Sequence, residues 1–161
     1  SRVKPEIVLH ENLPHINSLN DITPDFWETR LQQINHFEQN IHQNGCIIFK
    51  FFLHISKDEQ KHRLLRRLNN PNKQWKFSPE DLKDRKLWDD YISCYEEAIS
   101  ATSTPHAPWY IIPSDSKHHA RLLVAQIIKA KMQTYTDIKN PRLPQELQQQ
   151  IDHYKAELHQ S

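Results

Sequence analysis

Residues 46–60 read CIIFKFFLHISKDEQ and combine a strand with the start of a helix. The first ten residues form a nearly continuous run of β-branched and aromatic side chains. Such a run is typical of a strand that is buried on both faces of a parallel sheet. Ser56, with Glu59 three residues later, predicts a capping box, so a helix should begin directly after the strand and continue to about Asn69. A strand followed at once by a helix is the repeating unit of an α/β fold.

The flanking residues continue this alternation of helices and strands. Thr23-Pro24-Asp25 predicts the start of a helix that ends at Asn44-Gly45. Downstream, we expect a long helix over 78–101, a short strand over 109–112 and a last core helix over 115–135. Two strands are too few for a stable sheet on their own, so we expect the first strands to lie upstream of Ser1.

Composition excludes several classes of function. The 161-residue chain is 37% hydrophobic and has a formal net charge of +1, which argues against duplex DNA as a partner. Its single glycine, Gly45, excludes the glycine-rich loops that cradle phosphates. We find no run of 18 apolar residues, so we expect no membrane partner. Cys46 and Cys94 are interpreted as free, partly buried thiols of a protein in the reducing cytoplasm.

Positive charge is concentrated between residues 57 and 76. This segment carries seven basic residues against Asp58 and Glu59: Lys57, Lys61, Arg63, Arg66, Arg67, Lys73 and Lys76. On a helix, the three arginines should share one face and Leu64, Leu65 and Leu68 the opposite one. We see no acids placed to form i,i+4 pairs with the arginines. Because guanidinium groups pair bidentately with phosphate oxygens, this face suits a polyanionic ligand, although a solvated surface is the competing interpretation.

A second polar cluster spans residues 102–109 and contains Thr104 and Trp109. If these residues lie in the carboxyl-side loops of the sheet, they could hold a nucleobase. The residues alone favour a simpler interpretation, in which Trp109 is a core residue and 102–104 form a turn that ends a helix. Lys117 follows the second strand and is a further phosphate candidate. The eleven histidines show no metal-ligand spacing, so we predict no metal site.

The sequence resembles the polyphosphate kinase 2 family over roughly residues 25–125. The motifs that carry the resemblance are Trp27, Arg30, Ile34, Asn35, Phe37 and Glu38 in the first helix, KFFLHISKDEQ at 50–60, Arg63, Arg67, PNKQWK at 71–76, Asp81, Trp88, Asp89, Tyr91, Thr102-Ser103-Thr104, Ala107-Pro108-Trp109, Asp115, Lys117, Ala120 and Arg121. The tail, with Pro141 and Pro144, is most similar to the branch that phosphorylates both nucleoside mono- and diphosphates.

The resemblance implies the C-terminal half of a thymidylate-kinase-like P-loop fold, with parallel strands, flanking helices and a helical lid at about 57–80. Residues 1–135 would belong to this single domain and 136–161 to a polar tail helix. The implied activity is Mg²⁺-dependent transfer of a terminal phosphoryl group between inorganic polyphosphate and ADP, AMP or another nucleotide. The resemblance assigns polyphosphate binding to Arg63, Arg67, Lys73 and Lys76 and, less directly, to Lys57, Arg66 and Lys117. Nucleotide binding would fall to Trp109 and Thr104.

The chain departs from the family pattern in one large respect. The Walker A loop and the Walker B Asp-Arg pair, which would hold the phosphates and the Mg²⁺, have no counterpart in these residues. Arg2-Val3 resembles the segment shortly after Walker B. We therefore assign no catalytic residue to this chain and expect it to be inactive alone, while homologues suggest a homo-oligomer.

Two other functions remain open from the sequence. One is a non-catalytic module that binds polyphosphate or single-stranded RNA, with Trp75 as a stacking platform for a base. The other is the lid of an ordinary nucleotide kinase that uses ATP as its phosphoryl donor.

Overall fold

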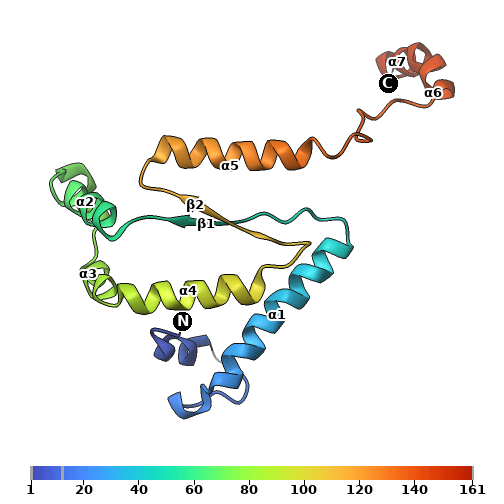
Figure 1. Ribbon diagram of the computed structural model, residues 1–161. Coiled ribbons are helices and arrows are strands. Elements are labelled where there is room, and N and C mark those ends of the chain that lie inside the picture. Colours follow the sequence, from blue (N-terminus) through green and yellow to red (C-terminus); the bar gives the residue numbers. More distant parts are fainter. Residues whose placement is uncertain (1, 12, 161) are drawn as a thin grey trace. The chain divides into compact units, whose positions relative to one another are not determined.

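The computed structural model describes residues 2–11 and 13–160, in two compact units, Ser1–Ile128 and Lys129–Ser161. The predicted boundary at residue 135 stays a prediction. The elements, in which η marks a 3-10 helix, are η1 (Pro5–Glu11), η2 (Leu19–Asp21), α1 (Pro24–Gln43), β1 (Lys50–His54), α2 (Lys57–Leu68), η3 (Pro71–Lys76), α3 (Pro79–Lys86), α4 (Trp88–Thr102), β2 (Trp109–Pro113), α5 (Lys117–Met132), α6 (Gln145–Gln149) and α7 (Ile151–Gln160) (Figure 1).

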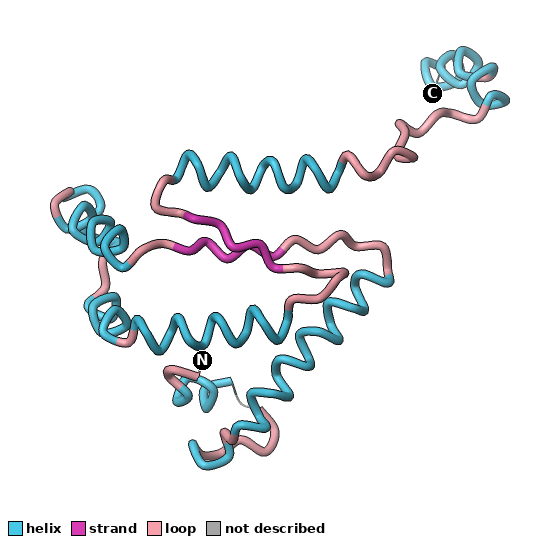
Figure 2. Tube along the Cα trace, in the orientation of Figure 1, coloured by secondary structure: helices cyan, strands magenta, loops and turns pink. Residues whose placement is uncertain are grey.

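The sheet consists of β1 and β2, paired in parallel from Lys50 opposite Trp109 to His54 opposite Pro113 (Figure 2). The α/β prediction is therefore confirmed, but the predicted strand over 46–55 is too long and is not buried on both faces. Leu53 is 57% exposed, because no third strand adjoins β1 within the described residues. Parallel strands reach full burial only when neighbouring strands and helices cover both faces.

Helix α1 begins and ends where its capping residues predict. The Thr23 hydroxyl accepts the Phe26 backbone N–H, and Pro24 occupies the first helical position. The chain leaves the helix through Asn44 and Gly45, whose φ of +87° is a backbone conformation that glycine adopts without strain. Gly45 therefore serves as a helix stop and not as part of a phosphate-binding loop.

The predicted helix over 78–101 is wrong in one respect: it is two helices. The start at Ser78 forms a complete capping box with Asp81. At Leu87, however, φ is −94° and ψ is 22°, and the Leu87 N–H donates to the Asp84 carbonyl three residues back. This tighter last turn ends α3 and lets α4 start in a new direction.

The core of the first unit is small. Its buried apolar residues are Val8, Leu64, Ala107, Ile112 and Ala120. Helix α4 contacts the strand pair through Tyr95, whose ring lies 4.9 Å from that of Phe52. Figure 1 shows α4 and the beginning of α5 on opposite sides of the two strands. The arrangement is a sheet layer between helical layers, as in α/β folds generally.

The second unit contains two short helices where the sequence predicts a single tail helix. Gln150 separates α6 from α7 and donates its N–H to the Leu147 carbonyl. Both cysteines are free, and Cys46 is exposed where partial burial was expected. No helix in the described part of the chain is long and apolar enough to cross a membrane.

Candidate functional site

The carboxyl ends of β1 and β2 meet at one edge of the sheet, since the strands are parallel. There the Ser114 N–H donates to the His54 carbonyl at 2.7 Å, which joins the two loops that follow the strands. Helix α2 begins at Lys57 and α5 at Lys117 beyond these loops. Ligands of open α/β sheets bind at this edge, so it is where the candidate site is assembled.

Asp115 holds the N-terminus of α2. Its Oδ1 accepts the Ser56 backbone N–H at 2.7 Å, while the Ser56 hydroxyl accepts the Glu59 N–H at 3.1 Å. Only half of the predicted capping box therefore forms, because Asp115, instead of Glu59, takes the Ser56 N–H. The hydrogen bonds from the Ser56 backbone and, next, from the Ser56 side chain lower the pKa of the Asp115 carboxyl below its ordinary 3.8, and the nearby Arg63 charge acts in the same direction.

This contact predicts a distinct acid sensitivity. Because the folded state lowers the pKa of Asp115, the group stabilises the fold above pH 3.8, and this contribution is lost as the pH falls through the lower, folded-state pKa. Replacing Asp115 with Asn should lower the free energy of unfolding near neutral pH, and the gap to the unsubstituted chain should narrow below pH 3.8. Urea unfolding followed by circular dichroism from pH 2 to pH 6 measures this. A gap of constant size over that range would contradict the assignment.

Arg63 points into the loops and not outward with its neighbours. Its Nε donates to Glu59 Oε1 at 2.7 Å, and its Nη2 donates to the carbonyls of Ser114 and Asp115 at 2.6 and 3.2 Å. The expectation that the arginines lack i,i+4 acids is thus wrong, since Glu59 stands four residues before Arg63.

The arginines and leucines of α2 occupy opposite arcs of the helix, but the leucine arc is not packed as a whole. Leu64 is buried, whereas Leu65 and Leu68 are exposed. The cause is Arg63, whose bonds turn the Arg63–Leu64 side of the helix toward the strand ends. Arg66 and Arg67 remain accessible, and Arg67 Nη1 lies 3.7 Å from Asp81 Oδ2.

The segment after α2 is the 3-10 helix η3. The Asn70 side chain accepts the Asn72 N–H at 3.0 Å and starts this helix. Gln74 Nε2 donates to the Leu68 carbonyl at 2.8 Å, which ties η3 to the end of α2. Trp75 is 78% exposed, and Lys76 Nζ lies 4.9 Å from the centre of its indole ring. The segment thus presents an aromatic surface flanked by cations.

Sequence reasoning missed Arg85, which connects α3 to the first turn of α2. Its Nη1 donates to the Lys57 carbonyl at 2.6 Å and to Gln60 Oε1 at 2.8 Å. Lys57 Nζ in turn lies 4.0 Å from Asp89 Oδ2. The only available signal was a basic residue inside a predicted helix, which is too common to be diagnostic.

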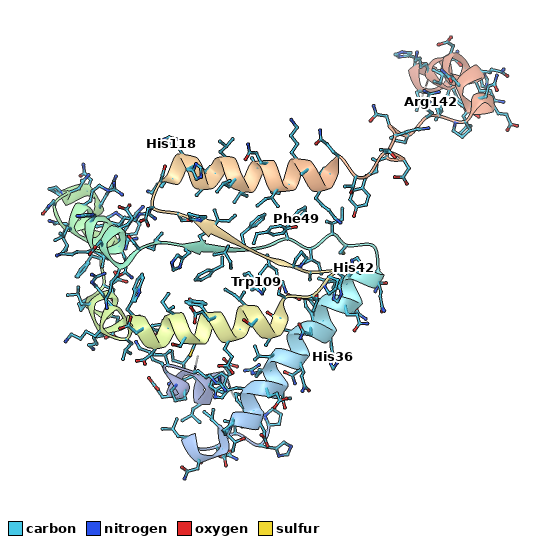
Figure 3. The ribbon with its side chains drawn as sticks, in the orientation of Figure 1. His36, His42, Phe49, Trp109, His118 and Arg142 are labelled. Atoms are coloured by element: carbon cyan, nitrogen blue, oxygen red, sulfur yellow. The ribbon has the colours of Figure 1, made fainter. Side chains whose placement is uncertain are left out.

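Trp109 and Thr104 lie at the opposite edge of the sheet. Trp109 begins β2, so the alternative in which residues 102–109 form carboxyl-side loops is wrong. The Trp109 indole N–H donates to Thr102 Oγ1 at 2.9 Å, on the α4 side of the strands (Figure 3). The Thr104 hydroxyl accepts the Ala107 N–H at 3.2 Å and closes a turn. These contacts are structural; binding of a nucleotide by either residue stays a prediction.

A buried ion pair at this amino-side edge was not foreseen. Lys50 Nζ lies 2.6 Å from Glu38 Oε2 and donates to the Thr102 carbonyl at 2.5 Å. Both charged side chains are only 10% exposed. The pair joins α1, β1 and the end of α4, so it stabilises the fold at a point remote from the basic lid.

The basic residues between Lys57 and Lys76 line neither of two cavities in the first unit. The larger, of about 800 Å³, lies against α1 and α4 and is mostly apolar, with Trp27, Ile34 and Tyr95 among its walls. The smaller, of about 330 Å³, lies between the strands and α4. The candidate site is therefore an open surface of α2, η3 and the strand ends, not an enclosed pocket.

The described residues do not fit a Mg²⁺ site of their own. Mg²⁺ takes several oxygen ligands in octahedral geometry, and no group of three His, Cys, Asp or Glu side chains within the described ranges could hold a metal ion. Of the histidines labelled in Figure 3, His36 and His42 lie on α1 and His118 lies on α5. The rings of His42 and His106 stack at 5.3 Å.

Comparison with known proteins places the chain in a family. The family model described as Polyphosphate kinase 2 (PPK2) matches residues 16–140. An ADP-polyphosphate phosphotransferase of Rhodopseudomonas palustris is 45% identical over 133 residues, covering 83% of this chain and 45% of the relative. An AMP/ADP-polyphosphate phosphotransferase of Meiothermus ruber is 45% identical over 119 residues, covering 74% of this chain and 45% of the relative.

A solved structure agrees with these relatives. Polyphosphate Kinase 2 from Arthrobacter aurescens TC1 has 37% sequence identity and a TM-score of 0.71, covering 81% of this chain and 47% of that one. The chain thus spans about half the length of the proteins it matches. Because the family model covers well over half of the residues, and the fold agrees, the chain belongs to the polyphosphate kinase 2 family.

Proposed function

We propose that this chain forms the polyphosphate-binding lid of an enzyme that transfers a terminal phosphoryl group between inorganic polyphosphate and a nucleoside mono- or diphosphate. The observation that carries the proposal is the placement of Arg66, Arg67, Lys73 and Lys76 on α2 and η3. These accessible cations lie on the two elements that follow the carboxyl end of β1. The relatives named as polyphosphate phosphotransferases support the same reaction.

The chemistry of the reaction explains why a lid of this kind is useful. Phosphoryl transfer depends mainly on positioning and on neutralising the negative charge of the phosphate oxygens. Accessible guanidinium and ammonium groups neutralise a polyphosphate chain without fixing one register along it. Mg²⁺, when bound, would neutralise negative charge on the reacting phosphates, and we propose that parts of the protein outside these residues hold it. Lys57 and Lys117, at the first positions of α2 and α5, are secondary candidates for the same anion.

We expect the purified chain to bind polyphosphate but not to phosphorylate ADP or AMP, since the described residues provide no Mg²⁺ site. Calorimetric titration with a polyphosphate and with a single-stranded RNA at two salt concentrations tests binding. Conversion of ADP to ATP tests transfer. Polyphosphate should bind more tightly, with an affinity that falls as salt rises. ATP formation would contradict the expected inactivity, and indifference to polyphosphate would overturn the proposed lid.

A second candidate function rests on Trp75. An indole that is 78% exposed beside Lys76 can stack on a nucleobase, as in proteins that bind single strands. Tight RNA binding together with failure to bind polyphosphate would favour this non-catalytic module. We also propose a cytoplasmic, self-associating protein, supported by the two free cysteines and by the unpaired edge of β1 within the described residues.

A further inference from the structure

We propose that Arg63 is a positioning residue that, with Asp115, fixes the base of the lid to the loop after β2, and that it is not a polyphosphate ligand. This inference rests on the proposed function, because the helix being positioned carries Arg66 and Arg67. It assigns Arg63 a different role from the other lid cations, although Arg63 lies among them in the sequence.

The hydrogen bonds that Arg63 makes within the protein leave no pair of its N–H groups free to bind a phosphate bidentately. A guanidinium grips an anion bidentately through Nη1 with Nη2, or through Nε with Nη2, so both arrangements require Nη2. In Arg63 both hydrogens of Nη2 are directed at backbone carbonyls, those of Ser114 and Asp115. Nε donates to Glu59, and the side chain is only 22% exposed. Only the two N–H groups of Nη1 remain, and without Nη2 they cannot form a bidentate pair.

Asp115 makes the second connection between α2 and the loop that follows β2. Its carboxylate accepts the Ser56 N–H at the start of α2, while Arg63, two turns further along, donates to the carbonyl of the same residue. The helix is therefore attached to the β2–α5 loop at two points about 10 Å apart along its axis, taking 1.5 Å of rise per residue. Two attachments fix the direction of a helix, whereas one would leave it free to pivot.

The direction of α2 determines where the binding residues lie. Arg66 and Arg67 follow Arg63 by three and four residues on the same helix, and η3 is joined to the end of α2 by Gln74. If the attachment at Arg63 is lost, these cations keep their charge but lose a common orientation. Affinity for a polyanion should then fall by a similar factor at every salt concentration, because the number of phosphate contacts is unchanged.

Comparing Arg63→Met with Arg66→Met in the complete 161-residue chain tests the inference, since both remove one positive charge from α2. For each variant, amide hydrogen exchange is measured without ligand. Polyphosphate affinity is measured from about 50 to 300 mM salt. Arg63→Met should speed exchange of the α2 amides roughly tenfold or more. It should lower the affinity for polyphosphate without changing the slope of log affinity against log salt concentration. Arg66→Met should leave exchange unchanged and reduce the slope by about one.

Each outcome is decisive. A reduced salt slope with unchanged exchange in Arg63→Met would make Arg63 a ligand and overturn the inference. An effect on exchange with no loss of affinity would reduce Arg63 to a stabilising residue and also overturn it. If Arg63→Met does not fold, Arg63→Lys, which keeps the charge but not the fork, should show the same faster exchange. Failure of the unsubstituted chain to bind polyphosphate would refute the proposed function, while the exchange measurement would still test whether Arg63 and Asp115 fix α2.

Discussion

Replacing Lys50 with Met should lower the free energy of unfolding by about 3–5 kcal/mol, as is typical when one partner of a buried ion pair is removed. Lys50 and Glu38 are both only 10% exposed, and their charged atoms lie 2.6 Å apart. The substitution leaves the Glu38 carboxylate buried without its cation, and it also removes the donor to the Thr102 carbonyl. Urea unfolding followed by tryptophan fluorescence measures the loss. A change of less than about 1 kcal/mol, the range of exposed pairs, would show that the pair is not buried in solution.

Lys83 provides a matched control for this prediction. Its Nζ lies the same 2.6 Å from Glu80 Oε1, but the two side chains are 67% and 56% exposed. Lys83→Met should therefore change the free energy of unfolding by no more than about 1 kcal/mol, as measured for exposed pairs. The double substitution Lys50→Met with Glu38→Leu should be more stable than Lys50→Met alone, because no unpaired charge is then left inside.

Neutralising the accessible lid cations together should reduce polyphosphate affinity by roughly a hundredfold to a thousandfold. Each cation near a phosphate contributes about 1 kcal/mol at 4 Å in water, and every 1.4 kcal/mol is a factor of ten. Replacing Arg66, Arg67, Lys73 and Lys76 with Gln removes four such contributions from surface positions. The affinity is measured by calorimetric titration at about 50 mM salt, and thermal unfolding should stay close to that of the unsubstituted chain.

The second unit supplies a control with the same change in net charge. Replacing Lys129, Lys131, Lys139 and Lys155 with Gln also removes four positive charges, from exposed positions outside the lid. This variant should bind polyphosphate nearly as well as the unsubstituted chain. If it loses as much affinity as the lid variant, binding depends on overall charge and not on α2 and η3.

Local signals in the sequence predicted the starts and ends of several elements. Thr23 with Pro24 marked the start of α1, and Gly45 marked its end, because these residue types satisfy or tolerate the special backbone of a helix terminus. Ser56 likewise marked the start of α2. Capping depends on residues a few positions apart, so it can be read without knowledge of the tertiary structure.

Contacts between distant residues could not be predicted in this way. The bonds from Arg63 to the Ser114 carbonyl and from the Ser56 N–H to Asp115 join segments more than 50 residues apart. Spacing along α2 placed Arg63 beside Arg66 and Arg67, but not the direction in which it points. Trp109 begins β2, as the predicted strand over 109–112 requires, so the alternative that placed residues 102–109 after a strand conflicted with that predicted strand.

Within the described residues one edge of β1 is unpaired, and this has a practical consequence for anyone handling the chain. Residues 46–55 are apolar and free of proline, a composition that favours ordered aggregates when a strand edge is accessible. Lysines on edge strands usually discourage such stacking, but Lys50 is held inside by Glu38 and offers no repulsion to an approaching strand. We therefore expect overproduction at high concentration to favour inclusion bodies. Replacing the exposed Leu53 with a charged residue is the simplest substitution against such aggregation.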